Sequence, residues 1–293
     1  MSIYKYVSFE NLKHILNGSV RITQPKAFND PFELLPEINL TNDINGFSLN
    51  ITSSQRENEP ARLPDDFESQ NCNDVASRDV LNGLNKLIGI FCVSENPNSL
   101  LMWSHYAEEY KGAVVEFDEN HEFFRGLFSV SYEDNRPKLD WELMTDTNGQ
   151  VRLSELCYKP KDWEYEAEKR IARFLNDGNV VGHVNGHDVV VMDIPLDCIK
   201  SVTMGERMSV ENQRLIFGKL YQTNIALHLA AVSNWGYTFR SEIIKIDRPI
   251  SECSPQISPR TAHIFTELKG SLGEVARWLV KEHPMAEMVN KTL

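Results

Sequence analysis

The chain has 293 residues, of which 41% are hydrophobic and 10% aromatic, so it can bury a sizeable core as one large domain or two smaller ones. Its formal net charge of -12 excludes a broad surface for nucleic acid or an anionic membrane, because both need an excess of Lys and Arg. No apolar run approaches the roughly 20 residues that cross a bilayer, so we expect a cytoplasmic protein without a membrane partner.

The first residues predict a strand, a helix and a second strand. Ser8 is the expected N-cap of a helix whose apolar residues recur at helical spacing, and Asn17-Gly18 is a natural helix end. Strands are expected on either side of this helix, at Tyr4–Val7 and Ser19–Thr23.

Residues 39–78 are polar, poor in aliphatic side chains and broken by two prolines. This composition predicts a long excursion with room for a short helix, which is either a mobile lid or a variable insertion. The main domain is expected to span residues 1–250. Residues 251–293 then form a linker rich in Pro and Ser followed by a helical C-terminal extension.

The rest of the chain predicts an α+β fold, in which packed helices accompany a mixed, largely antiparallel sheet. Asn185-Gly186 is the strongest hairpin signal in the sequence. The expected strands are Ile88–Val93, Gly112–Phe117, Phe128–Tyr132, Trp163–Phe174, Val180–Met192, Ile199–Met204 and Tyr237–Ile246. The expected helices are Leu100–Glu108, one or two within Glu211–Ser233, and Leu272–Val280.

An aromatic and polar cluster, Trp103, Ser104, His105 and Tyr106, falls on one of these helices. Successive helical residues project about 100 degrees apart, so at least one of the four faces a cleft or another element. His105 is the natural proton carrier, because the reference pKa of imidazole is about 6.5, and Lys111 adds a cation nearby. In the alternative interpretation, the two rings pack in the core and the other two residues bond to the backbone.

The segment Asn29-Asp30-Pro31-Phe32-Glu33 places an amide and two carboxylates around a loop stiffened by proline. One interpretation is a turn device, because Asp before Pro avoids helical backbone and Asn favours turns. In the functional interpretation, Asn29 or Asp30 hydrogen-bonds a ribose or amide group of a ligand.

The densest charge in the chain lies between Lys159 and Arg170. In a strand, Glu166, Glu168 and Arg170 share one face, together with Glu164. In a helix, the same run is an ordinary solvated face. Carboxylates held side by side resist joint ionisation, so the strand arrangement suits acid, base or cation-stabilising chemistry.

Common catalytic and metal-binding signatures are missing from the sequence. There is no GxxxxGK[ST], GxGxxG, HExxH or GxSxG. The five cysteines form no CxxC pair, which is neither a disulfide framework nor a zinc ribbon. His183 and His187 flank the Asn185-Gly186 turn, and we interpret them as a hairpin end, with His183 opposite Asp188, and predict no metal site.

Several short segments recur in a characteristic order and spacing from near Tyr4 to about Met208. They are 28–33, Cys92-Val93-Ser94, Met102–Tyr106, Lys111-Gly112 with Glu116-Phe117, Lys161–Arg170 and Ile199–Gly205. Together these segments resemble a bacterial family catalogued as domain of unknown function 2971, whose name implies no activity.

The order of elements is also similar to the layout of ADP-ribosyltransferase folds, including the DarT-like toxins. This resemblance implies a first strand that contributes an Arg or His for NAD, a Ser-bearing strand that braces the nicotinamide pocket, and a late Glu that stabilises the ribose cation. Ser94 matches the second feature. Glu168 matches the third, with Glu166 as the alternative, and Tyr4 lies on the first strand, where neither Arg nor His is present.

Three functions follow as hypotheses, and the sequence leaves open whether the chain is an enzyme. The first is an NAD-consuming ADP-ribosyltransferase-like or glycohydrolase-like effector, acting as a toxin or in phage defence, with NAD as substrate. Its expected catalytic residues are Glu168, Glu166 and His105, and its expected ligand-binding residues are Tyr4, Asn29, Asp30, Ser94, Trp103, Ser104, Tyr106, Lys111 and Arg170.

The second hypothesis is a non-catalytic sensor or protein-interaction module with an unknown protein partner. The third is a metal-dependent nuclease that uses Asp30, Glu33, Glu166 and Glu168 as oxygen ligands. The acidic charge balance of the chain counts against the nuclease. A small-molecule or nucleotide ligand is compatible with the first two.

Overall fold

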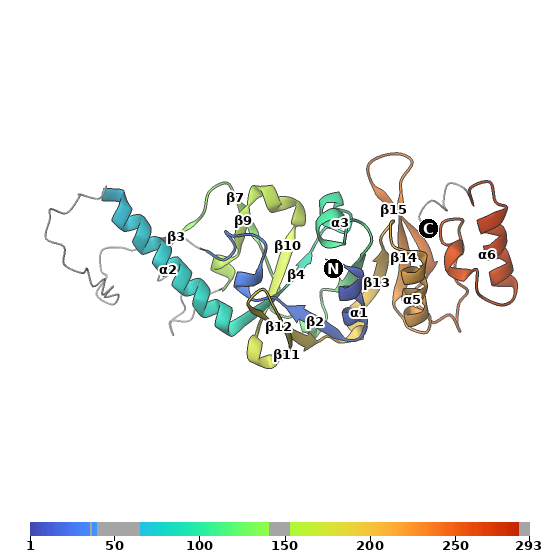
Figure 1. The fold of residues 1–293 in the computed structure, drawn as a ribbon, viewed down its shortest axis with the longest axis horizontal. Helices are drawn as coiled ribbons and strands as arrows, with labels where there is room; N and C mark the ends of the chain where they lie inside the picture. The colour runs from blue at the N-terminus through green and yellow to red at the C-terminus, as the bar shows by residue number, and fades with distance from the viewer. Residues whose placement is uncertain (36, 40–64, 141–152, 287–293) are drawn as a thin grey trace.

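The fold is built along one long sheet (Figure 1). The computed structural model describes residues 1–35, 37–39, 65–140 and 153–286. Within these ranges, no helix combines the length and the apolar character that a membrane crossing requires. Helix α2 (Asp65–Leu87) lies at one end of the molecule and helix α6 (Ser271–Lys281) at the other.

Within the described ranges the main sheet has eight strands, and neighbouring strands run antiparallel except for the parallel pair β13–β14. This arrangement confirms the predicted α+β class with its mixed, mostly antiparallel sheet. In spatial order the strands are β15 (Phe239–Lys245), β14 (Ala226–Val232), β13 (Ile199–Met204), β5 (Ala113–Asp118), β1 (Ser2–Val7), β4 (Ile88–Ser94), β10 (Glu168–Phe174) and β6 (Phe128–Ser129).

The two faces of this sheet carry different cores, because alternate residues of a strand point to opposite faces. Ile3 and Phe117 belong to the larger core, which also includes residues of helices α1 (Phe9–Leu16) and α5 (Val210–Leu220). On the other face, Tyr6 packs with Trp103 of helix α3 (Leu100–Tyr106). Strand β1 therefore carries part of both cores.

Two predicted local structures are confirmed in detail. Ser8 is the N-cap of α1, and its side chain accepts a hydrogen bond from the backbone N–H of Asn11. Strands β11 (Asn179–Val184) and β12 (His187–Asp193) form the predicted hairpin, and β12 also pairs with β2 (Ser19–Ile22). The register places His183 opposite Asp188, and Asn185 and Gly186 have the positive φ angles (51° and 82°) that this tight turn requires.

Two predicted elements are wrong. The helical prediction for Glu211–Ser233 holds only as far as α5, because Ala226–Val232 is strand β14, whose Leu227 and Leu229 are buried beside β13. The strand predicted at Trp163–Phe174 begins only at Glu168. The preceding residues form the 3-10 helix η4 (Lys161–Glu166), and Ala167 has left-handed backbone (φ 41°), which interrupts an extended strand.

The remaining segments complete the ends of the molecule. Residues 40–64 of the predicted excursion lie outside the described residues, and α2, at 23 residues, is longer than the short helix expected there. Near the C-terminus, the 3-10 helix η7 (Ala262–Phe265) and α6 contribute Phe265 and Ala276 to the larger core. Two short parallel pairs join β3 (Glu37–Asn39) to β8 (Lys138–Asp140) and β7 (Ser131–Glu133) to β9 (Tyr158–Pro160).

Candidate functional site

Three residues predicted from the sequence lie in one row across the main sheet. Tyr4 of β1 pairs directly with Ser94 of β4, and Ser94 pairs with Glu168 of β10. Residues that pair in this way project to the same face of a sheet. The row therefore gathers a phenol, a hydroxyl and a carboxylate from three segments that are distant in the sequence.

A cavity of about 120 Å³ opens over this row. Its size is comparable with that of apolar cavities known to admit a benzene ring, about 150 Å³. The cavity is lined by aromatic rings, carboxylates and two lysines, namely Tyr4, Tyr6, Phe28, Tyr106 and Trp163, then Asp30, Glu33, Glu166 and Glu168, then Lys5 and Lys159, together with Asn29, Cys92, Val93, Ser94 and Met102.

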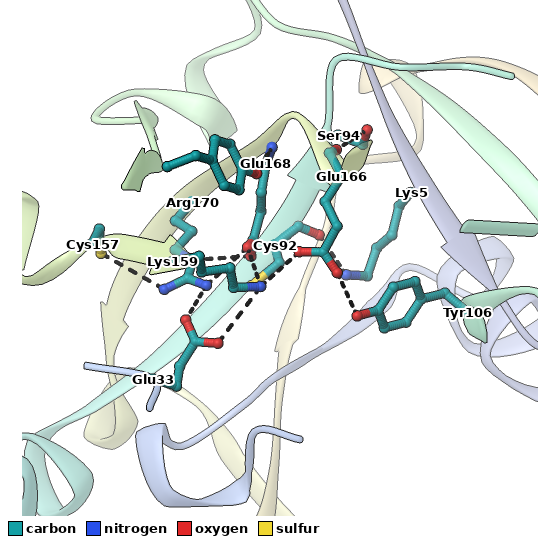
Figure 2. Close-up of polar contacts among 11 residues, drawn as sticks. Lys5, Glu33, Cys92, Ser94, Tyr106, Cys157, Lys159, Glu166, Glu168 and Arg170 are labelled. Atoms are coloured by element: carbon teal, nitrogen blue, oxygen red, sulfur yellow. Dashed lines mark hydrogen bonds and ion pairs between the residues drawn. The ribbon is translucent and has the colours of Figure 1, made fainter. Parts of the chain in front are cut away.

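Lys159 of β9 is the centre of a buried ion cluster (Figure 2). Its Nζ lies 2.7 Å from Oε2 of Glu166, 2.7 Å from Oε2 of Glu168 and 3.6 Å from Oε2 of Glu33. All four side chains are at most 8% exposed. Ionised groups this deeply buried are stable only when they are paired, and here one ammonium group contacts three carboxylates.

Arg170 supplies the second cation of the cluster. It is two residues after Glu168 on β10, so both side chains lie on the same face of the strand, as predicted. Nε and Nη2 of Arg170 lie 2.9 and 2.8 Å from the two oxygens of Glu168, and Nη2 also contacts Glu33. This forked contact is the strong geometry for a guanidinium and a carboxylate. The guanidinium also lies over the ring of Phe28, 5.4 Å from its centroid.

The backbone around Ala167 brings Glu166 into the same cluster. Glu166 is the last residue of η4, and the left-handed Ala167 then turns the chain into β10. Ser94 holds this turn, because its hydroxyl donates to the Glu166 carbonyl at 2.5 Å. On the other side, the Glu168 backbone N–H donates to the Tyr132 hydroxyl at 2.8 Å. Both glutamates are thus fixed through their main chain.

Among the residues that the structure describes, Glu166 has fewer partners than Glu168. Its Oε1 accepts a hydrogen bond of 2.5 Å from the Tyr106 hydroxyl, and its Oε2 contacts Lys159. The two oxygens of Glu168 meet two Arg170 nitrogens and Lys159. Glu166 therefore keeps more free acceptor capacity toward the cavity.

The pKa values of two carboxylates in the cluster, Glu168 and Glu33, are shifted in opposite directions. Burial alone raises the pKa of Glu168, but Arg170 and Lys159 together lower it to about 2. Burial raises the pKa of Glu33, and this effect outweighs its two cations. Burial and the Glu166 carboxylate raise the pKa of Tyr106, so its phenol stays protonated and donates. Lys159 is held as an ammonium, since the carboxylates raise its pKa against the effect of burial.

Lys5 and Cys92 also line the cavity and contact each other. Lys5 Nζ donates to the Cys92 carbonyl at 2.6 Å and lies over the Phe91 ring, 4.3 Å from its centroid. Burial lowers the pKa of Lys5. Burial, with Glu168 nearby, raises the pKa of the Cys92 thiol, so Cys92 stays a thiol rather than a reactive thiolate.

The structure brings only part of the predicted site together. The predicted residues that line the cavity are Tyr4, Asn29, Asp30, Ser94, Tyr106, Glu166 and Glu168. Arg170 lies directly behind them, fully buried.

Four other predicted residues lie elsewhere. Trp103 is 1% exposed and packs edge-on against Tyr6, with ring centroids 5.6 Å apart, so it is a core residue. Ser104 does not line the cavity. His105 is exposed, 6.3 Å from the Tyr165 ring, because it follows Trp103 on the helix and projects to another side. Lys111 is exposed and lies near Glu109.

Sequence reasoning missed Lys159 and Lys5 as site residues, and considered Glu33 only as a metal ligand. The available signal for Lys159 was its position after Cys157 and Tyr158, residue types that are often buried, where an unpaired lysine would be costly. Nothing in the local sequence of Lys5 indicates that this residue lines a cavity.

The carboxylates of this site are not arranged for a metal ion. Among the residues that the structure describes, no group of three or more His, Cys, Asp or Glu is placed to hold one. Lys159 and Arg170 lie between Glu33, Glu166 and Glu168, so their two positive charges already pair with the carboxylates that a metal would need.

Comparisons with known proteins found no matching family model, no matching curated protein and no matching solved structure. The resemblances drawn from the sequence therefore stay predictions, and the chemistry of the cavity carries the functional argument.

Proposed function

We propose that this chain is an enzyme that cleaves the bond between nicotinamide and ribose in NAD, and transfers the ADP-ribosyl group to an acceptor or to water. The observation that carries this proposal is the row Tyr4–Ser94–Glu168 beneath a ring-sized cavity, with Glu166 held at its edge. In this proposal the cavity admits the nicotinamide ring between aromatic walls.

Glu166 is assigned the central role. When the bond between C1′ and the ring nitrogen breaks, its electron pair stays on nicotinamide, which leaves as a neutral molecule. The positive charge moves to the ribosyl carbon. A fixed carboxylate stabilises such an oxocarbenium-like centre. Water or an acceptor hydroxyl then attacks C1′ and loses its proton.

The neighbours of Glu166 support this role through position and charge. The Tyr106 hydroxyl at 2.5 Å and Lys159 at 2.7 Å fix the orientation of the carboxylate. Ser94 braces the backbone of Glu166 at 2.5 Å. Glu168, bound by Arg170 and Lys159, is a positioning residue that keeps Lys159 in place.

A second candidate is a ligand sensor without turnover. The observation that favours it is that Glu168, the residue suggested by the resemblance, is saturated by Arg170 and Lys159, as in a structural ion network. A sensor would bind NAD or a related nucleotide in the same cavity and release it unchanged.

The test is to incubate the purified chain with NAD labelled in its adenylate part, with and without cell extract. Released nicotinamide is measured, and so is label bound to macromolecules, which separates hydrolysis from transfer. We expect the wild type to release nicotinamide and Glu166→Gln to do so about a hundredfold more slowly or less.

Glu164→Gln is the matched control. Glu164 is an exposed glutamate on the same 3-10 helix and does not line the cavity. Its substitution is expected to leave the rate unchanged. If the wild type binds NAD but releases no nicotinamide under either condition, the sensor is correct and the enzyme is not. Equal losses in the two variants would also contradict the role of Glu166.

A further inference from the structure

One carboxylate of the cavity has an unused oxygen. Asp30 is 9% exposed and lines the cavity. Its Oδ1 accepts a hydrogen bond of 2.8 Å from the Phe32 backbone N–H, whereas its Oδ2 has no hydrogen-bond donor among the described residues. A buried carboxylate oxygen without a donor is unfavourable. A ligand with an N–H group would supply the missing hydrogen bond.

The formal charges around the cavity leave an excess of negative charge. Asp30, Glu33, Glu166 and Glu168 are the carboxylate residues that line it, and Lys5 and Lys159 are the lysines among its lining residues. Arg170, behind the wall, contacts Glu33 and Glu168 and adds one more positive charge. Four carboxylates against three cations leave one negative charge, which a ligand with one positive charge would balance.

The aromatic walls already bind cations of the protein itself. Arg170 lies over the ring of Phe28, 5.4 Å from its centroid, and Lys159 lies 5.7 Å from the centroid of Trp163. The negative faces of aromatic rings attract cations, and cages of such rings recognise organic cations. Tyr4 and Tyr106 also line the cavity and offer two further rings to a ligand.

We infer that the cavity selects a planar organic cation that carries an N–H donor, and that Asp30 is the residue that sets this selection. The inference rests on the proposed function for assigning this cavity as the ligand site, and it names the class of group that enters. An amidinium on an aromatic ring, or a pyridinium ring with a carboxamide, satisfies the charge, the flat shape and the hydrogen bond to Asp30.

Benzamidine and benzamide test this inference, because they have nearly the same shape but only benzamidine is charged at neutral pH. Their binding to the wild-type chain is measured by titration calorimetry at low ionic strength. We expect benzamidine to bind about tenfold more tightly than benzamide. Equal affinities, or no binding of benzamidine at millimolar concentration, would overturn the inference without any variant.

The variant Asp30→Asn tests whether Asp30 causes the preference for benzamidine over benzamide. The variant keeps the shape and the oxygen that accepts from Phe32, but removes the charge. It is expected to lower the preference for benzamidine to about twofold. Asp162→Asn is the matched control, since Asp162 is an exposed aspartate that does not line the cavity, and it should keep the full preference. A full preference in a folded Asp30→Asn variant would overturn the role of Asp30, and Asp30→Ser repeats the test if Asp30→Asn does not fold.

The outcome is separable from that of the proposed function. A strong preference for benzamidine together with no cleavage of NAD supports the cation cavity and contradicts the enzyme. Cleavage of NAD together with equal binding of the two probes supports the enzyme and contradicts the cation selection.

Discussion

Two buried lysines lie near opposite ends of the main sheet and use different partners. Lys159 of β9 contacts three carboxylates beside the cavity, one of which is Glu168 of β10. Lys245 of β15 is 0% exposed, and its Nζ donates to the backbone carbonyls of Thr223, Ile246 and Arg248 at 2.8, 2.9 and 2.9 Å. Both ammonium groups have several partners, but within the described part of the chain only Lys159 has ionised ones.

The difference separates a structural lysine from a lysine in a site. Neutral carbonyls do not offset the desolvation of Lys245, and burial lowers its pKa. Its three bonds tie the end of β15 to the loop that precedes β14. Carboxylates raise the pKa of Lys159. By formal charge, the carboxylates around the cavity outnumber the cations by one. A buried lysine is therefore not by itself the mark of a site. What distinguishes Lys159 from Lys245 is a group of carboxylates beside a cavity.

The largest effect is expected from substituting each lysine by Met. Lys159→Met leaves buried carboxylates with too few cations, so the free energy of unfolding should fall by about 3–5 kcal/mol. Lys245→Met leaves carbonyls without a donor but also removes a buried charge, so the fall should be about 1–3 kcal/mol. Urea denaturation measures both values. A larger loss for Lys245→Met would contradict the comparison.

The next effect concerns acid pH and Glu168. Because its pKa is about 2 in the folded chain against an ordinary 4.5, the unfolded chain binds more protons between these values. Stability from this group is present above pH 4.5 and is lost as the pH falls to about 2, by a total of about 3 kcal/mol. The contribution of Glu33 to stability changes with pH in the opposite direction, since its pKa is raised in the folded chain.

Urea denaturation from neutral to acid pH checks this prediction in the wild type and in Glu168→Gln. The variant should start less stable and lose less stability between pH 4.5 and about 2. Glu164→Gln, at the exposed glutamate of η4, should follow the wild type. An unchanged acid profile in Glu168→Gln would show that its ion pairs contribute nothing.

A smaller effect is expected from the Tyr106 hydroxyl. Tyr106→Phe removes the hydrogen bond of 2.5 Å to Glu166 and should lower the free energy of unfolding by about 1–2 kcal/mol. The same variant should slow nicotinamide release, because Glu166 loses its orientation. Tyr165→Phe is the matched control on η4, and thermal denaturation with the nicotinamide assay compares the two. Equal rates in both variants would contradict the orienting role of Tyr106.

The smallest effect is expected from Ala167→Gly. Ala167 has a positive φ of 41°, which costs an L-residue about 1 kcal/mol and glycine almost nothing. The substitution should raise the free energy of unfolding by about 0.5 kcal/mol, after the greater freedom of glycine in the unfolded chain is subtracted. Urea denaturation checks the sign. A loss above about 1 kcal/mol would mean that the alanine methyl group packs better than the turn geometry suggests.

Local signals in the sequence predicted local structure well. Ser8 as a helix cap and Asn185-Gly186 as a hairpin turn depend on a few adjacent residues, and the structure confirms both. The shared face of Glu168 and Arg170 followed from strand alternation alone. The strand Ala226–Val232 was missed because its composition also suits a helix, and its pairing with β13 depends on residues distant in the sequence.

Only part of the candidate site could be predicted, because its contacts also depend on residues that are distant in the sequence. Glu166 and Glu168 were identified from their spacing, but their common partner Lys159 lies on β9, which pairs with β7 rather than with β10. His105 was predicted as a site residue because imidazole carries protons, but on the helix its side chain projects to solvent and does not line the cavity. Side-chain chemistry is visible in a sequence, whereas the direction of a side chain depends on packing.

The most direct test of the proposed chemistry is the rate of nicotinamide release from NAD by the purified wild-type chain and by Glu166→Gln, both shown to be folded. We predict measurable release by the wild type and a decrease of about a hundredfold or more in the variant. Release that is equal in the two proteins, or no release by a wild type that binds NAD, would contradict the assignment of Glu166 as the catalytic carboxylate.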